Sequence, residues 1–108
     1  MPDTLKEVIE GMAGQFNAEA AKGLTAVYQY DITGDGGGQF YNAITDGALE
    51  VKEGTHDSPN ITITMTTKDY LDLVNGKLNG QMAFMSGKLK IKGDMSLAMK
   101  LQNLFKTA

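Results

Sequence analysis

The stretch GQMAFMSGKLKIKGDMSLAMKLQNLF, residues 80–105, holds four of the seven methionines in this 108-residue chain. Methionine is unbranched and flexible, so it fills irregular space in protein interiors. A cluster of methionines therefore indicates one of two things. Either the core is difficult to pack, or the fold keeps a space that accepts another molecule.

The end of this stretch, residues 95–105, is predicted to be a helix with a wide apolar arc. Leucines form one stripe, and Met95, Met99 and Gln102 form a neighbouring one, with Phe105 helping to join the two. Such an arc must contact more than the sheet beneath it. Periodicity leaves two interpretations open: the second stripe packs on a short methionine-bearing helix at 79–86, or it lines a gap that an apolar ligand enters.

Apolar periodicity also predicts the elements that precede the last helix. Spacings of three and four predict helices from residue 5 to about 16 and from residue 66 onward, and Thr4 with Glu7 and Thr66 with Asp69 have the spacing of capping boxes. Alternation with period two predicts strands over residues 24–33, 40–45, 49–52, 61–66 and 88–92.

Each predicted strand has one apolar face and one polar face. This pattern is typical of a mostly antiparallel sheet with all its helices on one side. The helical connection between the fourth and fifth strands allows one parallel pairing. We therefore expect an α+β fold with a five-stranded mixed sheet, built as a single domain over residues 1–108.

Composition excludes several classes of function. With a net charge of −3 and a pI near 5.0, the chain lacks the basic footprint of nucleic-acid binding, so nucleic acid is not an expected partner. Cysteine is absent, which fits a reducing compartment and makes the cytoplasm the expected location. Neither a secretory signal nor an apolar run long enough to cross a bilayer is visible in the sequence.

Three local motifs have ordinary explanations. The glycine-rich run at 34–38 lacks the lysine and hydroxyl residue of a phosphate-binding loop and predicts a hairpin tip. His56 with Asp57 and Ser58 predicts a solvated turn, because triad residues come from separate segments. The lysines at 88, 90 and 92 fit either a docking patch for anionic membranes or a charged face that discourages edge pairing, and we favour the second.

Several sequence motifs resemble those of a known family. GKLKIKGDMSLAMKLQNLF, residues 87–105, closely resembles the signature end of the sterol carrier protein 2 family of lipid-binding domains, and MAFMSG and KDYLDLVNGKLN extend the match. The resemblance implies a hydrophobic tunnel between sheet and helices that takes up sterols, fatty acids, fatty acyl-CoA or phospholipids, with no catalytic residues. Because the chain starts at Met1 and lacks a peroxisomal C-terminal tripeptide, we expect a free-standing cytoplasmic carrier.

We therefore expect non-catalytic lipid binding and transfer by a monomer, with transient contact to a membrane or a lipid enzyme and with neither metal nor cofactor. Gln102 is expected at the mouth of the cavity, although an ordinary surface glutamine remains an alternative. The expected lining consists of Phe40, Ile44, Ile63, Met82, Phe84, Met85, Met95, Met99 and Phe105. The alternative function is a protein-interaction or dimerisation module that uses the same apolar helical surface. A weaker alternative is a hydrolase using Ser58 and His56.

Overall fold

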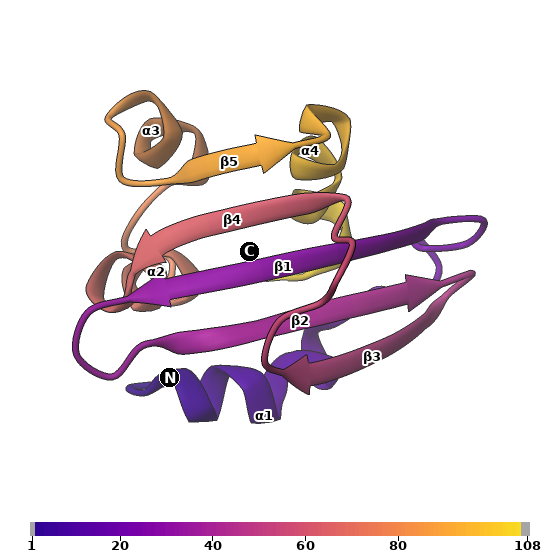
Figure 1. The fold of residues 1–108 in the computed structure, drawn as a ribbon, viewed down its shortest axis with the longest axis horizontal. Coiled ribbons are helices and arrows are strands. Elements are labelled where there is room, and N and C mark those ends of the chain that lie inside the picture. Colours follow the sequence, from indigo (N-terminus) through magenta and orange to yellow (C-terminus); the bar gives the residue numbers. More distant parts are fainter. Residues whose placement is uncertain (1, 107–108) are drawn as a thin grey trace.

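A computed structural model describes residues 2–106, and its centre is one five-stranded sheet (Figure 1). The strands are β1 (Thr25–Thr33), β2 (Gly38–Thr45), β3 (Ala48–Glu53), β4 (Ile61–Thr66) and β5 (Lys90–Gly93). Their order is β3-β2-β1-β4-β5, and β1 pairs parallel with β4 while the other neighbours are antiparallel. The predicted mixed sheet with one parallel pairing is confirmed.

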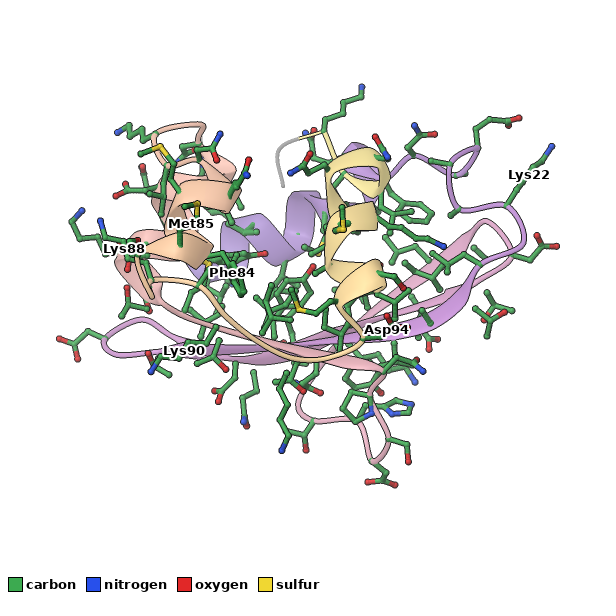
Figure 2. All side chains as sticks on the ribbon, turned by 90° about the horizontal axis from the view of Figure 1, so that it is seen from above. Lys22, Phe84, Met85, Lys88, Lys90 and Asp94 are labelled. Atoms are coloured by element: carbon green, nitrogen blue, oxygen red, sulfur yellow. The ribbon has the colours of Figure 1, made fainter. Side chains whose placement is uncertain are left out.

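Four helices cover one face of this sheet, as the edge-on view in Figure 2 shows. They are α1 (Leu5–Gln15), α2 (Thr67–Val74), α3 (Gly80–Met85) and α4 (Met95–Leu104). Helix α1 lies near β3, whereas α2 and α4 lie over β4. The predicted arrangement of helices on a single side of the sheet is therefore confirmed.

The helix starts follow the predicted capping residues. The hydroxyl of Thr4 accepts from the backbone N–H of Glu7, and the hydroxyl of Thr66 accepts from that of Asp69, both at 3.2 Å. The Glu7 carboxylate accepts from the N–H of Asp3 instead of that of Thr4, so the box closes one residue earlier than expected. Each cap satisfies a donor that the helix leaves free.

Aromatic side chains fill the centre of the core. Tyr30 stacks on Phe40 with ring centroids 4.5 Å apart, and Tyr70 of α2 tilts against both rings. The buried hydroxyl of Tyr28 donates to the carbonyl of Leu97 at 2.7 Å, which joins β1 to α4. Burial, followed by the charge of Asp94, raises the pKa of Tyr28 to about 12.

The predicted strand bounds differ from the observed ones by at most two residues, and the start of β5 and the end of α2 each have a local reason. Strand β5 begins at Lys90 instead of Lys88, because the N–H groups of Lys88 and Leu89 both donate to the carbonyl of Ala83 and complete the end of α3. Helix α2 ends at Val74, shortly before Gly76, whose φ of 77° is left-handed and terminates a right-handed helix readily.

The outer face of the sheet is less exposed than its polar pattern predicts. Gln29 is only 5% exposed, and its amide nitrogen donates to the carbonyls of Phe40 and Gly54, both at 3.1 Å. Its amide oxygen accepts from the backbone N–H of His56 at 2.8 Å. These bonds hold the loop that follows β3 across the outer face of the sheet.

Candidate functional site

Helices α3 and α4 present large apolar side chains to the surface. Few of their side chains pack into the core: Ala83 of α3 is fully buried, and Leu97 and Leu104 of α4 are buried. Within residues 2–106, five large apolar side chains are exposed, and all five come from these two helices. They are Met82 (68%), Phe84 (44%), Met85 (78%), Met95 (46%) and Met99 (75%).

The exposed fractions exclude one of the two interpretations of the last helix, the one in which its second stripe packs on α3. If the second stripe of α4 packed on α3, Met95 and Met99 would be covered, but they are 46% and 75% exposed. The methionines of α3 are equally uncovered. The second stripe thus exists as predicted, and no described part of the chain covers it.

The other expected lining residues lie inside the closed core. Phe40, Ile44 and Ile63 are at most 3% exposed and face the helices from β2 and β4. Phe105 is also 3% exposed and packs against Phe16, with ring centroids 5.4 Å apart. The structure therefore exposes the five residues on α3 and α4 and separates them from these four buried residues.

Gln102 is exposed and lines a pocket at the far end of α4. This pocket has a volume of about 520 Å³ and is bounded by Phe16, Asn17 and Phe105 as well. A second pocket of about 520 Å³ lies beside it, between Lys22 and Lys100. The predicted polar residue is thus next to a pocket, but one lined by the connection after α1 and not by the methionines of α3.

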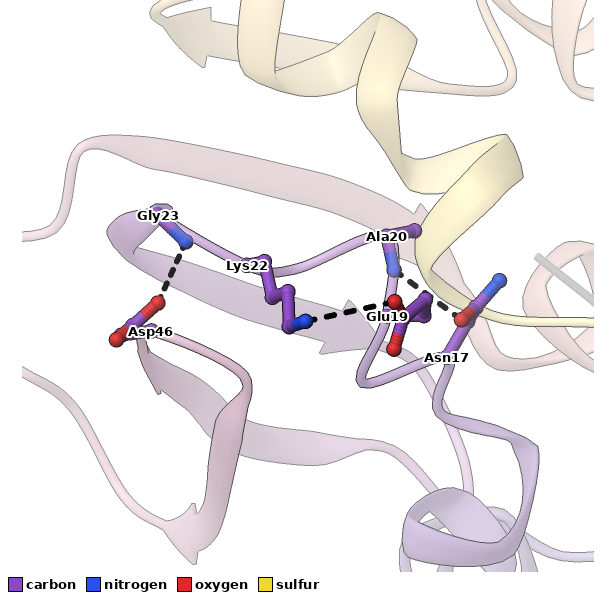
Figure 3. Close-up of polar contacts among 6 residues, drawn as sticks. All are labelled: Asn17, Glu19, Ala20, Lys22, Gly23 and Asp46. Carbon is purple, nitrogen blue, oxygen red and sulfur yellow. Dashed lines mark hydrogen bonds and ion pairs between the residues drawn. The ribbon is translucent and has the colours of Figure 1, made fainter.

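The segment 17–23 forms a wall shared by these two pockets and is held by its own polar contacts (Figure 3). The Asn17 side chain accepts from the N–H of Ala20 at 3.2 Å, and the Asp46 carboxylate accepts from the N–H of Gly23 at 2.7 Å. Sequence reasoning did not select Phe16 or Asn17 as site residues. Phe16 ends the apolar periodicity of the first helix, which indicates burial but no site, and no periodic signal marks Asn17, which meets α4 only after folding.

Two polar groups inside the core were also missed as candidates. The Asn42 amide nitrogen lies 3.3 Å from the hydroxyl of Tyr30, which it donates to, and Asn42 is fully buried. Its side-chain oxygen has no hydrogen-bond partner within residues 2–106. Burial raises the pKa of Tyr30 well above its usual value. Asn42 alternates with Phe40 and Ile44 on the buried face of β2, and a polar residue at such a position was the signal available in the sequence.

The remaining sequence motifs form local structure. The N–H of Ser58 donates to Nδ1 of His56 at 3.0 Å, and the imidazole packs edge-on against Tyr41, so the predicted turn is confirmed. The glycine run forms the predicted hairpin tip, where a Cβ on Gly37 would collide with the carbonyl oxygen of Ile32. Residues 2–106 contain no group of three side chains placed to hold a metal ion. Among the helices described, none is both long and apolar enough to span a bilayer.

Comparison with known proteins gives a family match over almost the whole chain. Residues 5–106 match the SCP-2 sterol transfer family. The chain is also similar to hydroxysteroid dehydrogenase-like protein 2 of Homo sapiens, with 35% identity over 101 residues that cover 93% of this chain and 24% of that protein. The chain spans about a quarter or less of the length of such curated relatives.

Solved structures show the same fold. The solution structure of palmitated SCP2L2 from Aedes aegypti has a TM-score of 0.76 and 27% identity, covering 91% of this chain and 90% of that one. The apo form of sterol carrier protein 2 from Yarrowia lipolytica has a TM-score of 0.66 and 28% identity, covering 84% of this chain and 74% of that one. The order and layers of the elements therefore match those of sterol carrier proteins.

Proposed function

The chain belongs to the SCP-2 sterol transfer family, and from this premise we propose that it binds a long-chain lipid and transfers it without chemical change. The observation that carries the proposal is the uncovered apolar surface of α3 and α4. Single exposed apolar side chains are common on protein surfaces, but here five large ones gather on two helices, at least two on each, which is unusual for a domain without an apolar partner. The candidate guests are fatty acids, fatty acyl-CoA, phospholipids and sterols.

A fatty acyl chain is the guest that the comparisons support most directly. One of the similar structures, from Aedes aegypti, is described as palmitated. Each methylene removed from water contributes about 0.8 kcal/mol, so roughly twelve buried methylenes contribute about 10 kcal/mol before ordering costs are subtracted. Affinity then needs no specific polar contact, and flexible methionines can repack around different guests.

We assign the walls of the site to α3 and α4 and its floor to the sheet. Met82, Phe84 and Met85 would contact the guest from one side, and Met95 and Met99 from the other. Ile63, Phe40 and Ile44 would form the floor, with Phe105 at the far end. Because these four are buried in the structure, a guest reaches them only by parting the helices from the sheet, and this movement would open the proposed tunnel. Gln102 would then meet a polar head group.

We propose that the chain acts as a carrier and not as an enzyme, in the cytoplasm and as a monomer. The family assignment supports the carrier, and some relatives contain the domain as part of a longer protein named as an enzyme, such as hydroxysteroid dehydrogenase-like protein 2. The position of His56 is consistent with it, because its Nδ1 accepts from a neighbouring backbone N–H. A His56→Ala variant should bind lipid like the wild type and should show no change in any ester turnover.

Native mass spectrometry and titration with a fluorescent fatty acid test the proposal. The wild type should bind one guest saturably. The double variant Met85→Gln/Met99→Gln should bind at least about 10-fold more weakly, because each methionine that a guest covers contributes up to about 1.5–3 kcal/mol. Ala13→Gln/Ala48→Gln is the matched control, since both alanines are exposed on other elements. Absence of saturable uptake would refute the carrier.

The second candidate function, an interaction or dimerisation module, is favoured by the same uncovered helices. Light scattering after size exclusion separates the two functions. A monomer whose melting temperature rises with added lipid supports the carrier, because a ligand that binds only the folded state stabilises it. A dimer whose melting temperature does not change when lipid is added supports the interaction module.

A further inference from the structure

Charge is distributed very unevenly along this chain. Residues 77–108 contain six lysines and one acidic residue, Asp94, whereas residues 1–76 contain four lysines and twelve acidic residues. The formal charges are therefore +5 and −8, which together give the net charge of −3. An acidic protein thus carries a cationic C-terminal third.

The exposed apolar side chains lie in the same third. All five come from α3 and α4, and these helices lie at the two ends of β5, one of the two edge strands of the sheet (Figure 1). Figure 2 looks onto this side of the molecule and shows Phe84 and Met85 on α3, with Lys88 and Lys90 at the same end. We call the surface formed by α3, residues 86–89, β5 and α4 the cationic edge.

We propose that the cationic edge docks on the surface of an anionic lipid bilayer. The lysines would lie among the phosphate groups, and the methionines and Phe84 would enter the boundary between head groups and acyl chains. This combination of exposed apolar side chains and flanking lysines is the one that interfacial membrane binding uses. The inference rests on the proposed function in one respect, because the same side chains are proposed to meet the guest.

The protection of an edge strand does not account for the whole surface. Lysines on an edge strand discourage edge-to-edge pairing, and this explains Lys90 and Lys92, which alternate with the core-packed Ile91. Lys88 lies outside β5, in the turn after α3, where no strand edge needs protection. The exposed methionines have no role in preventing strand pairing. Ile91 pairs with the inward-facing Ile63, so Lys90 and Lys92 project from the face of β5 that lies away from the helices. A bilayer that meets this edge of the sheet would contact the lysines on one side of the strand and the apolar side chains of the helices on the other.

Charge separation would also orient the molecule at the membrane. The acidic part, which contains α1 and most of the sheet, is repelled by anionic lipid, while the cationic edge is attracted. Each lysine near such a surface is worth about 1 kcal/mol. Because the electrostatic part is screened over a Debye length of about 10 Å at 0.1 M salt, docking should weaken as salt rises.

The test compares two charge-matched triple variants on vesicles. The edge variant is Lys88→Gln/Lys90→Gln/Lys92→Gln, and the control is Lys22→Gln/Lys52→Gln/Lys68→Gln, whose lysines pair with nearby acids outside the edge. Both lose three positive charges. Co-sedimentation is measured with vesicles of phosphatidylcholine alone and with vesicles in which a third of the lipid is phosphatidylglycerol.

The wild type should prefer the phosphatidylglycerol vesicles, and salt should reduce that preference. The edge variant should partition about 100-fold more weakly, as three contributions of about 1 kcal/mol imply, while the control stays close to the wild type. Equal binding to both vesicle types, or equal losses in both variants, would overturn the inference. A dimer with no vesicle binding would also overturn it and would identify a second copy as the occupant.

Fatty-acid uptake measured without vesicles separates this inference from the proposed function. The edge variant should take up the fluorescent fatty acid like the wild type, because its lysines do not belong to the proposed lining. If uptake fails in the wild type but anionic vesicles are still bound selectively, the carrier is refuted and the docking surface stands. If uptake succeeds and selective vesicle binding is absent, the docking surface is refuted alone.

Discussion

Residues 1–76 and residues 77–108 differ in how far their large apolar side chains are buried. The first part supplies fifteen of the nineteen buried core residues and none of the five exposed large apolar side chains. The second part supplies four core residues and all five exposed ones. Helices α3 and α4 thus contribute only a few side chains to the core, and their other large apolar side chains remain exposed to solvent.

The comparison shows that apolar content alone does not indicate a core. Met65 on β4 is 2% exposed and Met99 on α4 is 75% exposed, although both occupy apolar positions of regular elements. The first methionine stabilises the fold by leaving water, while the second contributes little until something covers it. Stability and binding should therefore respond to different residues in the two parts.

The largest expected effect comes from the matched pair Phe40→Ala and Phe84→Ala. Phe40 is fully buried and stacks on Tyr30, so its removal leaves a cavity and should cost about 3–5 kcal/mol of unfolding free energy. Phe84 is 44% exposed, and its truncation should cost less than about 1 kcal/mol. Urea titration measures both. Equal losses of unfolding free energy in the two variants would contradict the difference in burial between the two parts of the chain.

An intermediate effect is expected where the two parts are joined by Tyr28. Tyr28→Phe removes the hydrogen bond to the carbonyl of Leu97 and should cost about 1–2 kcal/mol at neutral pH. In the wild type the raised pKa of about 12 means that the fold favours the neutral phenol, so this contribution is complete below pH 10 and is lost between pH 10 and 12.

Urea titrations at several alkaline pH values measure this difference. Burial is the largest cause of the raised pKa values of Tyr30 and Tyr70 and is present in both proteins, while the charge of Tyr28 makes a smaller contribution to that of Tyr30. Most of the difference between the curves therefore comes from Tyr28 itself. The wild type should lose about 1 kcal/mol more than the variant by pH 11. Parallel stability curves for the two proteins would contradict this.

The smallest expected effect concerns Asp94, the one acidic residue of the cationic part. Its carboxylate accepts from the N–H and hydroxyl of Ser96, and these bonds hold the pKa of Asp94 below its usual value. Asparagine caps helices as well as aspartate does, so Asp94→Asn should leave the melting temperature almost unchanged. Removing the negative charge should strengthen binding to phosphatidylglycerol vesicles about 5-fold, by co-sedimentation. Weaker binding would argue against docking by this edge.

Much of the fold could be predicted because its signals are local. Alternation in β1, β2 and β4 marked the buried face correctly, and Thr4 and Thr66 marked helix starts. The candidate site was predicted less well. The sequence placed ten residues in one lining, and the structure puts five on the surface, four in the core and Gln102 beside a different pocket.

By itself the sequence determined the elements, the face that each turns inward and the apolar surplus of the last helix, since periodicity and capping act within a few residues. Only the tertiary structure decided that α3 leaves the second stripe of α4 uncovered, and that Lys90 and Lys92 lie on an edge strand of the sheet, on the face away from the helices. The physical reason is that coverage depends on where the β4-to-β5 crossover places α3 relative to α4. That position results from long-range strand pairing, which no local pattern encodes.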